Sequence, residues 1–275
     1  MVALNISAWT ARKYDKKATE KTTSDAGAAP DAGRFNKALL GTIEQLQRVS
    51  KAANAARTFH YANTLPWMQE ARILPTANFL TYTQEMRALK TDFDAAVLDF
   101  LSEYPTLKLA AIATLNGLYQ ESDYPQPAEL PGKFKFETAF SPVPDAADFR
   151  LDLAQEDMEK IKAELTGALE KTQAAAMRDL WERLHDAVQH MAERLASPDA
   201  IFRDSLLGNL GELVQLLPRL NIANDPALAT MTQEVEQRLC GYAPDSLRKN
   251  PNDRANAAQS AAAIAAKMGA FMGGN

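Results

Sequence analysis

The sequence predicts an all-α fold: an elongated helical bundle of long antiparallel, coiled-coil-like helices with a small non-helical insertion rich in proline and aromatic residues. Three observations predict it. Apolar residues recur every three or four positions through most of the chain, which is the spacing of one face of an amphipathic helix. Two such stretches, 76–104 and 152–196, are much longer than an average helix. Six of the 14 prolines, which break helices, lie between these two stretches.

The chain is predicted to have three parts. Residues 1–33 form a flexible N-terminal arm, residues 34–250 an elongated helical domain, and residues 251–275 a C-terminal alanine-rich helix. Within the central domain, residues 120–150 are a non-helical insertion. No internal repeat of fixed period is present.

The N-terminal arm carries a weak strand-like alternation at Val2, Leu4 and Ile6, followed by a polar stretch. Five basic residues lie in that stretch: Arg12, Lys13, Lys16, Lys17 and Lys21. One interpretation is a mobile arm without a defined role. The alternative is a basic arm for an acidic partner, although the acidic residues between 15 and 25 dilute its charge.

The first helical stretch runs from residue 34 to about 56, and an aromatic-rich connector with Pro66 and Pro75 follows. Thr76 is then suited to cap a helix that ends at Pro105. Its apolar seam has a mean spacing of 3.5 residues, which is typical of a coiled coil. The seam consists of Phe79, Tyr82, Met86, Leu89, Phe93, Ala96 and Phe100. A shorter helix is expected over 107–119.

In the insertion, phenylalanines alternate with lysines around residues 133–140, which predicts at most a small hairpin. The longest helix begins near Asp152 and ends near residue 196, a rod of roughly 60 Å. We expect residues 76–104 to pack along it. Serine–proline and aspartate–proline pairs at 197 and 225 mark two further helix starts. A last helix is expected from 253 to 272.

Composition restricts the class of protein. The formal net charge of −5 argues against a general nucleic-acid binder, which needs a basic surface. The single cysteine, Cys240, fits a reducing compartment. The N-terminus lacks a basic region followed by an apolar core, so no signal peptide is expected, and no apolar run is long enough to span a bilayer. We therefore expect a cytoplasmic protein.

No catalytic pattern is present, so we expect a protein that is not an enzyme and has no cofactor or metal. His185 and His190 lie about 140° apart around a helix and cannot hold one ion together. Cys240 lies at a helix C-terminus, where the helix dipole disfavours a thiolate. No glycine-rich phosphate loop, nucleophile elbow or paired-cysteine spacing is found.

Aromatic residues are concentrated in the two non-helical segments, and two interpretations are open. They either pack the ends of the long helices or form a recognition surface, because aromatic residues are enriched at interface hot spots. The candidate interaction residues are Trp67, Arg72, Tyr124, Phe134, Phe136 and Phe140. The C-terminal helix adds Ile264, Met268 and Phe271 on one face, which we assign to association rather than to the core.

Four short motifs resemble a family signature: Thr64-Leu65-Pro66-Trp67, Arg72-Ile73-Leu74-Pro75, Asp123-Tyr124-Pro125 and Pro142-Val143-Pro144. Together they resemble an uncharacterised family of helical proteins of phages and mobile elements, over most of residues 34–250. That family has no established activity and no catalytic residues. Its members are often encoded near MoxR-like or CobS-like AAA+ ATPases, which implies a bacterial host cell and an adaptor role by association.

The leading hypothesis is therefore a phage or mobile-element scaffold or adaptor that binds proteins, with an AAA+ ATPase and a homo-oligomer as candidate partners. The alternative is a nucleic-acid-associated accessory protein that uses the basic arm and stacks bases on the aromatic residues. A third, weaker hypothesis is membrane insertion by long helices, although residues 109–118 are too short for a span.

Overall fold

The computed structural model describes residues 1–67, 71–143, 155–197 and 200–272, and it is mostly helical with two small sheets. The helices in the described residues are α1 Lys16–Asp25, α2 Glu44–Ala62, α3 Thr76–Leu115, α4 Gln155–Ala196, α5 Ser205–Leu220, α6 Pro226–Leu239, α7 Pro244–Lys249 and α8 Pro251–Met272. The strands are β1 Val2–Ser7, β2 Arg12–Tyr14, β3 Asn36–Ala38, β4 Leu65–Pro66, β5 Arg72–Ile73 and β6 Lys135–Phe140. The purely helical prediction is therefore corrected.

The sheets explain part of this difference. One has the strand order β4-β5-β1-β6, with Val2 paired to Arg72 in an antiparallel ladder. The other is the antiparallel pair β2–β3, in which Lys13 lies opposite Lys37. The alternation at the N-terminus is thus a strand, and the stretch 133–140, predicted as a small hairpin, is the single strand β6 beside β1.

The chain divides into two compact units. The first unit comprises Met1–Ala3, Tyr61–Tyr82 and Phe140–Asn275, and the second comprises Leu4–His60 and Thr83–Ala139. The predicted division at residues 33 and 250 differs from this one. The predicted elongated outline stays a prediction.

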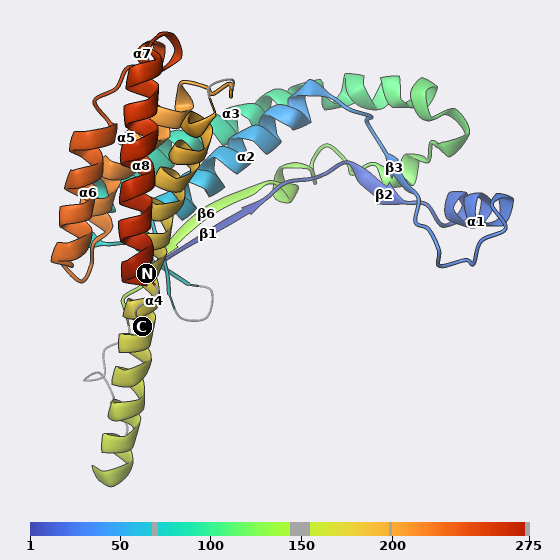
Figure 1. The fold of residues 1–275 in the computed structure, drawn as a ribbon. Coiled ribbons are helices and arrows are strands. Elements are labelled where there is room, and N and C mark those ends of the chain that lie inside the picture. Colours follow the sequence, from blue (N-terminus) through green and yellow to red (C-terminus); the bar gives the residue numbers. More distant parts are fainter. Residues whose placement is uncertain (68–70, 144–154, 198–199, 273–275) are drawn as a thin grey trace. The chain divides into compact units, whose positions relative to one another are not determined.

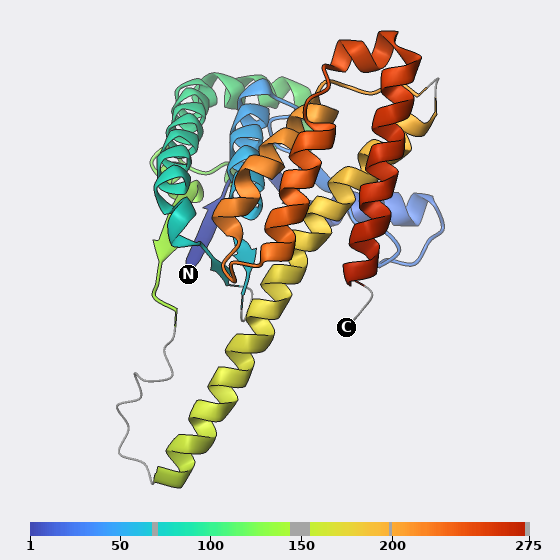
Figure 2. The ribbon, with the colours of Figure 1, turned by 60° about the vertical axis from the view of Figure 1, so that its left-hand side comes forward.

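In the first unit, α5, α6 and α8 pack against α4 (Figure 1). The core stripe of α4 is fully buried from Ala176 to Leu195 and includes Leu180, Leu184 and Val188. Figure 2 shows the first turns of α4 running beyond the ends of these neighbouring helices. Within the first unit, the helix that packs along α4 is α8. The predicted packing of residues 76–104 along α4 stays a prediction.

The prediction that the C-terminal helix is reserved for association is wrong. Ala257, Ala261, Ile264 and Met268 are all buried in the core of the first unit. The physical reason is close packing, because a row of alanines lets the α8 backbone approach the leucine-rich face of α4. The helix itself, from Pro251 to Met272, is where the sequence predicts it.

In the second unit, residues of the predicted flexible arm form ordered elements, which corrects that prediction. The Asp15 carboxylate accepts a hydrogen bond from the Ala18 backbone N–H at 3.0 Å and so caps α1. Thr19 and Thr23 are buried on the inner face of α1. The Thr19 hydroxyl also accepts from the Phe35 N–H at 3.0 Å, which ties α1 to the segment before β3.

Three helix boundaries also differ from the predictions. The helix predicted to begin at the serine–proline pair at 197 is α5, which begins at Ser205. The first predicted helix begins at Glu44 rather than at residue 34, because β3 occupies the start of that stretch. Pro105 does not end α3, which continues to Leu115. Pro105 lies on the exposed face, where water can solvate the carbonyl left without its usual donor.

Candidate protein-docking surface

The structure places most of the predicted aromatic residues of the insertion in the interior of the second unit. Tyr124 is buried, and its hydroxyl donates a 2.6 Å hydrogen bond to the Leu39 carbonyl. The ring of Phe136 lies 5.5 Å from that of Phe93, and the ring of Phe134 lies 5.6 Å from that of Phe100. The packing interpretation is therefore the correct one for these three residues, since their contacts face inward.

Trp67 and Arg72 lie in the first unit and have internal contacts. Trp67 is half-buried against the core. Arg72 donates to the carbonyls of Thr64 and Tyr61, at 2.7 and 3.2 Å, and Arg183 donates to the same two carbonyls. Burial and the neighbouring Arg183 guanidinium lower the pKa of Arg72. These guanidinium groups bind the carbonyls at and just after the end of α2, which is a structural role.

The remaining predicted interaction residues divide between surface and core. Phe140 is 49 % exposed and its ring lies 5.5 Å from that of Phe79. Ile264 and Met268 are buried in the core, as described above. The side chain of Phe271 lies outside the described residues.

The five basic residues of the arm are all exposed. Arg12 and Lys13 belong to β2, and Lys16, Lys17 and Lys21 to α1. Lys16 pairs with Glu20 at 3.6 Å. Within the described part of the chain, the other four form no ion pair with a carboxylate. The arm is thus a folded basic surface rather than a mobile segment.

The sequence reasoning missed an exposed apolar row on the second half of α3. It consists of Leu98, Leu101, Pro105, Leu109 and Ile112, here called the outward stripe. Leu98 is 67 %, Leu109 69 % and Ile112 47 % exposed, and Leu101 is partly exposed. Steps of three, four, four and three residues keep the five side chains on one face of the helix.

The outward stripe is exposed because a different face of α3 packs against the second unit. Phe93, Val97, Phe100 and Tyr104 are buried in the core of the second unit and occupy a face about 120° away. A helix that is apolar on two faces needs a second neighbour, because exposed leucines in a row are unfavourable in water. The missed signal was the spacing from 98 to 112, which the assumed helix end at Pro105 cut in two.

The outward stripe carries little charge. Ser102 lies beside it, and Asp94, one turn before Leu98 on the same face, is paired with Lys90. Lys108, which flanks the stripe, is paired with Glu121. The surface can therefore bind an apolar partner face.

The titratable groups considered from the sequence are the histidines of α4 and Cys240. His185 lies beside Asp186, with a 3.4 Å separation of Nδ1 and Oδ1. Burial, together with Glu236, raises the pKa of the Cys240 thiol, which disfavours a nucleophilic thiolate. Across the described ranges, no three His, Cys, Asp or Glu side chains are placed to hold a metal ion.

In the part of the chain that the structure describes, no helix has the length and apolarity that a membrane span requires. Compared with protein-family models, with curated proteins and with solved structures, the chain shows no match.

Proposed function

We propose that this chain is a non-enzymatic scaffold or adaptor that acts through protein–protein binding, with the outward stripe of α3 as its docking surface. The observation that carries the proposal is the high exposure of Leu98, Leu109 and Ile112 in one helical row. The phage or mobile-element origin and the AAA+ ATPase partner stay predictions of the sequence resemblance.

We propose that the outward stripe binds the outward stripe of a second copy of this chain. Its mean spacing of 3.5 residues is that of helices that pack knobs into holes. A surface with so little charge has no preference for an acidic or a basic partner, whereas a symmetric pair needs only that one patch fits itself. The stripe is roughly 21 Å long, which is short for an obligate dimer, so we expect reversible association.

The test is the replacement of Leu109 by Glu in the full chain. Two facing stripes would then bring two carboxylates into an apolar contact, so we expect the mass in sedimentation velocity to fall to that of the monomer at every concentration. The wild-type mass should rise with concentration. Ala110→Glu adds the same charge one position away from the stripe and serves as the matched control, with wild-type association expected.

A wild-type protein that stays monomeric at the highest attainable concentration would contradict the second copy as occupant. A dimer that Leu109→Glu leaves intact would contradict the choice of surface. Circular dichroism of both variants, expected to match the wild type, separates loss of association from loss of folding.

The second candidate function is that of a nucleic-acid-associated accessory protein, which the exposed basic surface of β2 and α1 favours. Arg12, Lys13, Lys17 and Lys21 are free of acidic partners within the described residues, so they are available to phosphates. The aromatic half of that hypothesis is weakened, because buried Tyr124 and Phe136 cannot stack on bases.

A gel shift with single-stranded DNA at two salt concentrations tests this candidate. Binding by the basic surface should weaken steeply with salt, and Lys17→Glu with Lys21→Glu should abolish it. Lys51→Glu and Lys249→Glu, which add the same charge at exposed positions elsewhere, are the control. Binding that is insensitive to salt, or equal in both double variants, would contradict the role of the arm.

A further inference from the structure

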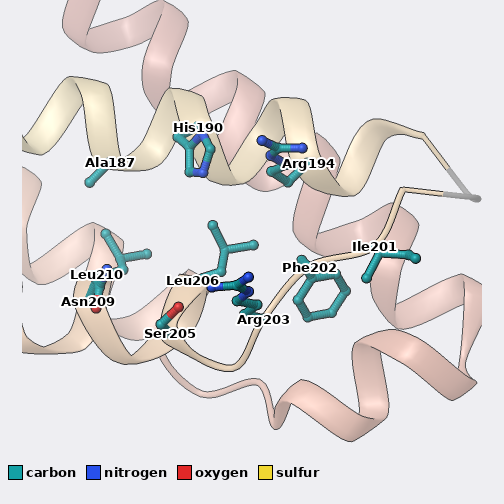
Figure 3. A pocket seen from close by; sticks show the side chains of 10 residues that line it. All are labelled: Ala187, His190, Arg194, Ile201, Phe202, Arg203, Ser205, Leu206, Asn209 and Leu210. Carbon is teal, nitrogen blue, oxygen red and sulfur yellow. The ribbon is translucent and has the colours of Figure 1, made fainter. Parts of the chain in front are cut away.

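A cavity of about 490 Å³ lies in the first unit between α4 and the segment that leads into α5. His190 and Arg194 enter it from α4, one turn apart, and Arg203 enters from the opposite segment. Figure 3 shows His190 pointing from α4 toward the segment that carries Arg203 and Leu206. This volume is in the usual range for small-molecule sites.

The polar lining of this cavity is cationic. Two guanidinium groups and one imidazole line it together with the hydroxyl of Ser205 and the amide of Asn209, and none of its lining residues is acidic. Within the described ranges, the side chains of Arg194 and Arg203 have no carboxylate partner. The hollow is open to water, because Arg194 and Arg203 are both exposed. Two guanidinium groups that line one hollow favour an anion between them.

Three described acidic residues near the lining in sequence make other contacts, whereas Asp199 lies outside the described residues. Asp204, beside Arg203, pairs with Arg248. Glu193, beside Arg194, accepts a 2.9 Å hydrogen bond from the Gln189 amide. Asp186, one turn before His190, faces His185. Among the described residues, none of these three neighbouring carboxylates is paired with Arg194 or Arg203.

Arg194 does not bind the free carbonyls at the C-terminal end of α4 either. A basic residue in the last turn of a helix commonly stabilises the free carbonyls there. In α4 that role belongs to Arg254, whose guanidinium donates to the carbonyls of Leu195, Arg194 and Ala200 at 3.2, 3.2 and 2.8 Å. Within the described residues, the guanidinium of Arg194 makes no such carbonyl contact.

The wall opposite α4 is held in place by packing. Phe202 is buried, with the guanidinium of Arg248 5.0 Å and that of Arg254 5.5 Å from its ring centroid. The helix α5 begins at Ser205, in the lining itself, so its positive end faces the same space. Leu206 and Leu210 give the cavity an apolar side.

We propose that this cavity is a binding site for a phosphate group, held by the guanidinium groups of Arg194 and Arg203 with Ser205 and Asn209 as further hydrogen-bond partners. A phosphate dianion matches two guanidinium groups in charge and accepts bidentate hydrogen bonds from each. The group can come from free phosphate or from a mononucleotide, whose base would lie against Leu206 and Leu210. The site is independent of the outward stripe.

Isothermal titration calorimetry of the full chain in phosphate-free buffer tests the proposal with three probes: inorganic phosphate, AMP and adenosine. We expect inorganic phosphate and AMP to bind and adenosine not to bind. Arg203→Gln should weaken binding about tenfold, as the loss of a charge-assisted hydrogen bond implies, and Arg194→Gln with Arg203→Gln should abolish it. Arg178→Gln, an exposed arginine of the same helix α4, is the control of equal charge change and should bind as the wild type does.

The probes also distinguish the two sources. Equal affinity for inorganic phosphate and AMP identifies the free anion, and tighter binding of AMP identifies a nucleotide whose base uses the apolar wall. The proposal is overturned if neither phosphate probe binds the wild-type protein at millimolar concentration. It is equally overturned if adenosine binds as well as AMP, or if the double variant, folded by circular dichroism, binds as the wild type does.

Discussion

Replacing Lys37 with Met is expected to lower the free energy of unfolding of the second unit by about 3–5 kcal/mol, the usual cost of breaking a buried ion pair. Lys37 is 3 % exposed. Its Nζ atom lies 2.6 Å from Asp123 Oδ2 and 3.0 Å from Asp15 Oδ2, and it donates to the Leu118 carbonyl at 3.0 Å. Methionine fills a similar volume but leaves both carboxylates without their cation.

The pKa shifts of Lys37 and Asp15 also indicate that their ion pair stabilises the folded state. Burial alone would lower the pKa of Lys37, but hydrogen bonds to Asp123 and Asp15 outweigh it and the pKa is raised. The backbone N–H of Ala18 and then Lys37 lower the pKa of Asp15. The stability that Asp15 contributes is present above the pKa that this carboxyl has in the unfolded chain. It is lost as the pH falls through the lower pKa of the folded state. The stability that Lys37 contributes is present below the pKa that its amine has in the unfolded chain. It is lost as the pH rises through the higher pKa of the folded state. The difference between wild type and variant should therefore be constant from about pH 5 to pH 9.

The control for this experiment is Lys13→Met. Lys13 lies opposite Lys37 in the β2–β3 ladder, but it is exposed and forms no ion pair within the described residues. We expect it to change stability by less than about 0.5 kcal/mol. Urea unfolding gives the free energies, and hydrogen exchange of the amides in 12–25 and 35–40 assigns the loss to this unit. Equal stability of the two variants would show that the buried ion pair does not hold the arm in place.

Local signals in the sequence were sufficient for several helices. Asp225 followed by Pro226 predicts the start of α6, where the Asp225 carboxylate accepts from the Ala227 N–H at 2.8 Å. Thr76 marks the start of α3, and the long apolar stripe predicts α4 with its 42 residues. In each case the deciding contacts lie within one or two turns of the residue that signals them.

The arm could not be predicted in this way, because its order depends on residues far apart in the sequence. Lys37 joins Asp15 to Asp123, and the Tyr124 hydroxyl reaches the Leu39 carbonyl. Local composition around residue 15 shows charged and small residues, which are typical of a mobile segment. The ion pair that organises them is visible only when the insertion folds against β3.

The candidate sites also differ in how far local sequence predicts them. Alternating phenylalanines and lysines before and within β6 predict which side chains point inward, but composition alone cannot tell a core from a recognition surface. Phe136 therefore proved to be a core residue. The cavity with Arg194 and Arg203 joins a helix to the segment after it. Its cationic lining becomes visible only when the segment that carries Arg203 is placed opposite α4.

Replacing Ala261 with Asp is expected to lower the free energy of unfolding of the first unit by at least about 3 kcal/mol. Ala261 is 0 % exposed and lies on the face of α8 that packs into the core with α4. A carboxylate there would be placed in an apolar environment with no cation beside it, and its bulk would also force the two helices apart.

Ala262→Asp is the matched control, because Ala262 is the next residue of the same helix and is exposed. Both substitutions carry the same loss of helix propensity, below about 1 kcal/mol, so their difference measures burial alone. Urea unfolding followed by circular dichroism should show an early transition for Ala261→Asp and a nearly unchanged one for Ala262→Asp. If both variants unfold together with the wild type while the mass in light scattering falls for Ala261→Asp, the inner face of α8 serves association and does not belong to the core.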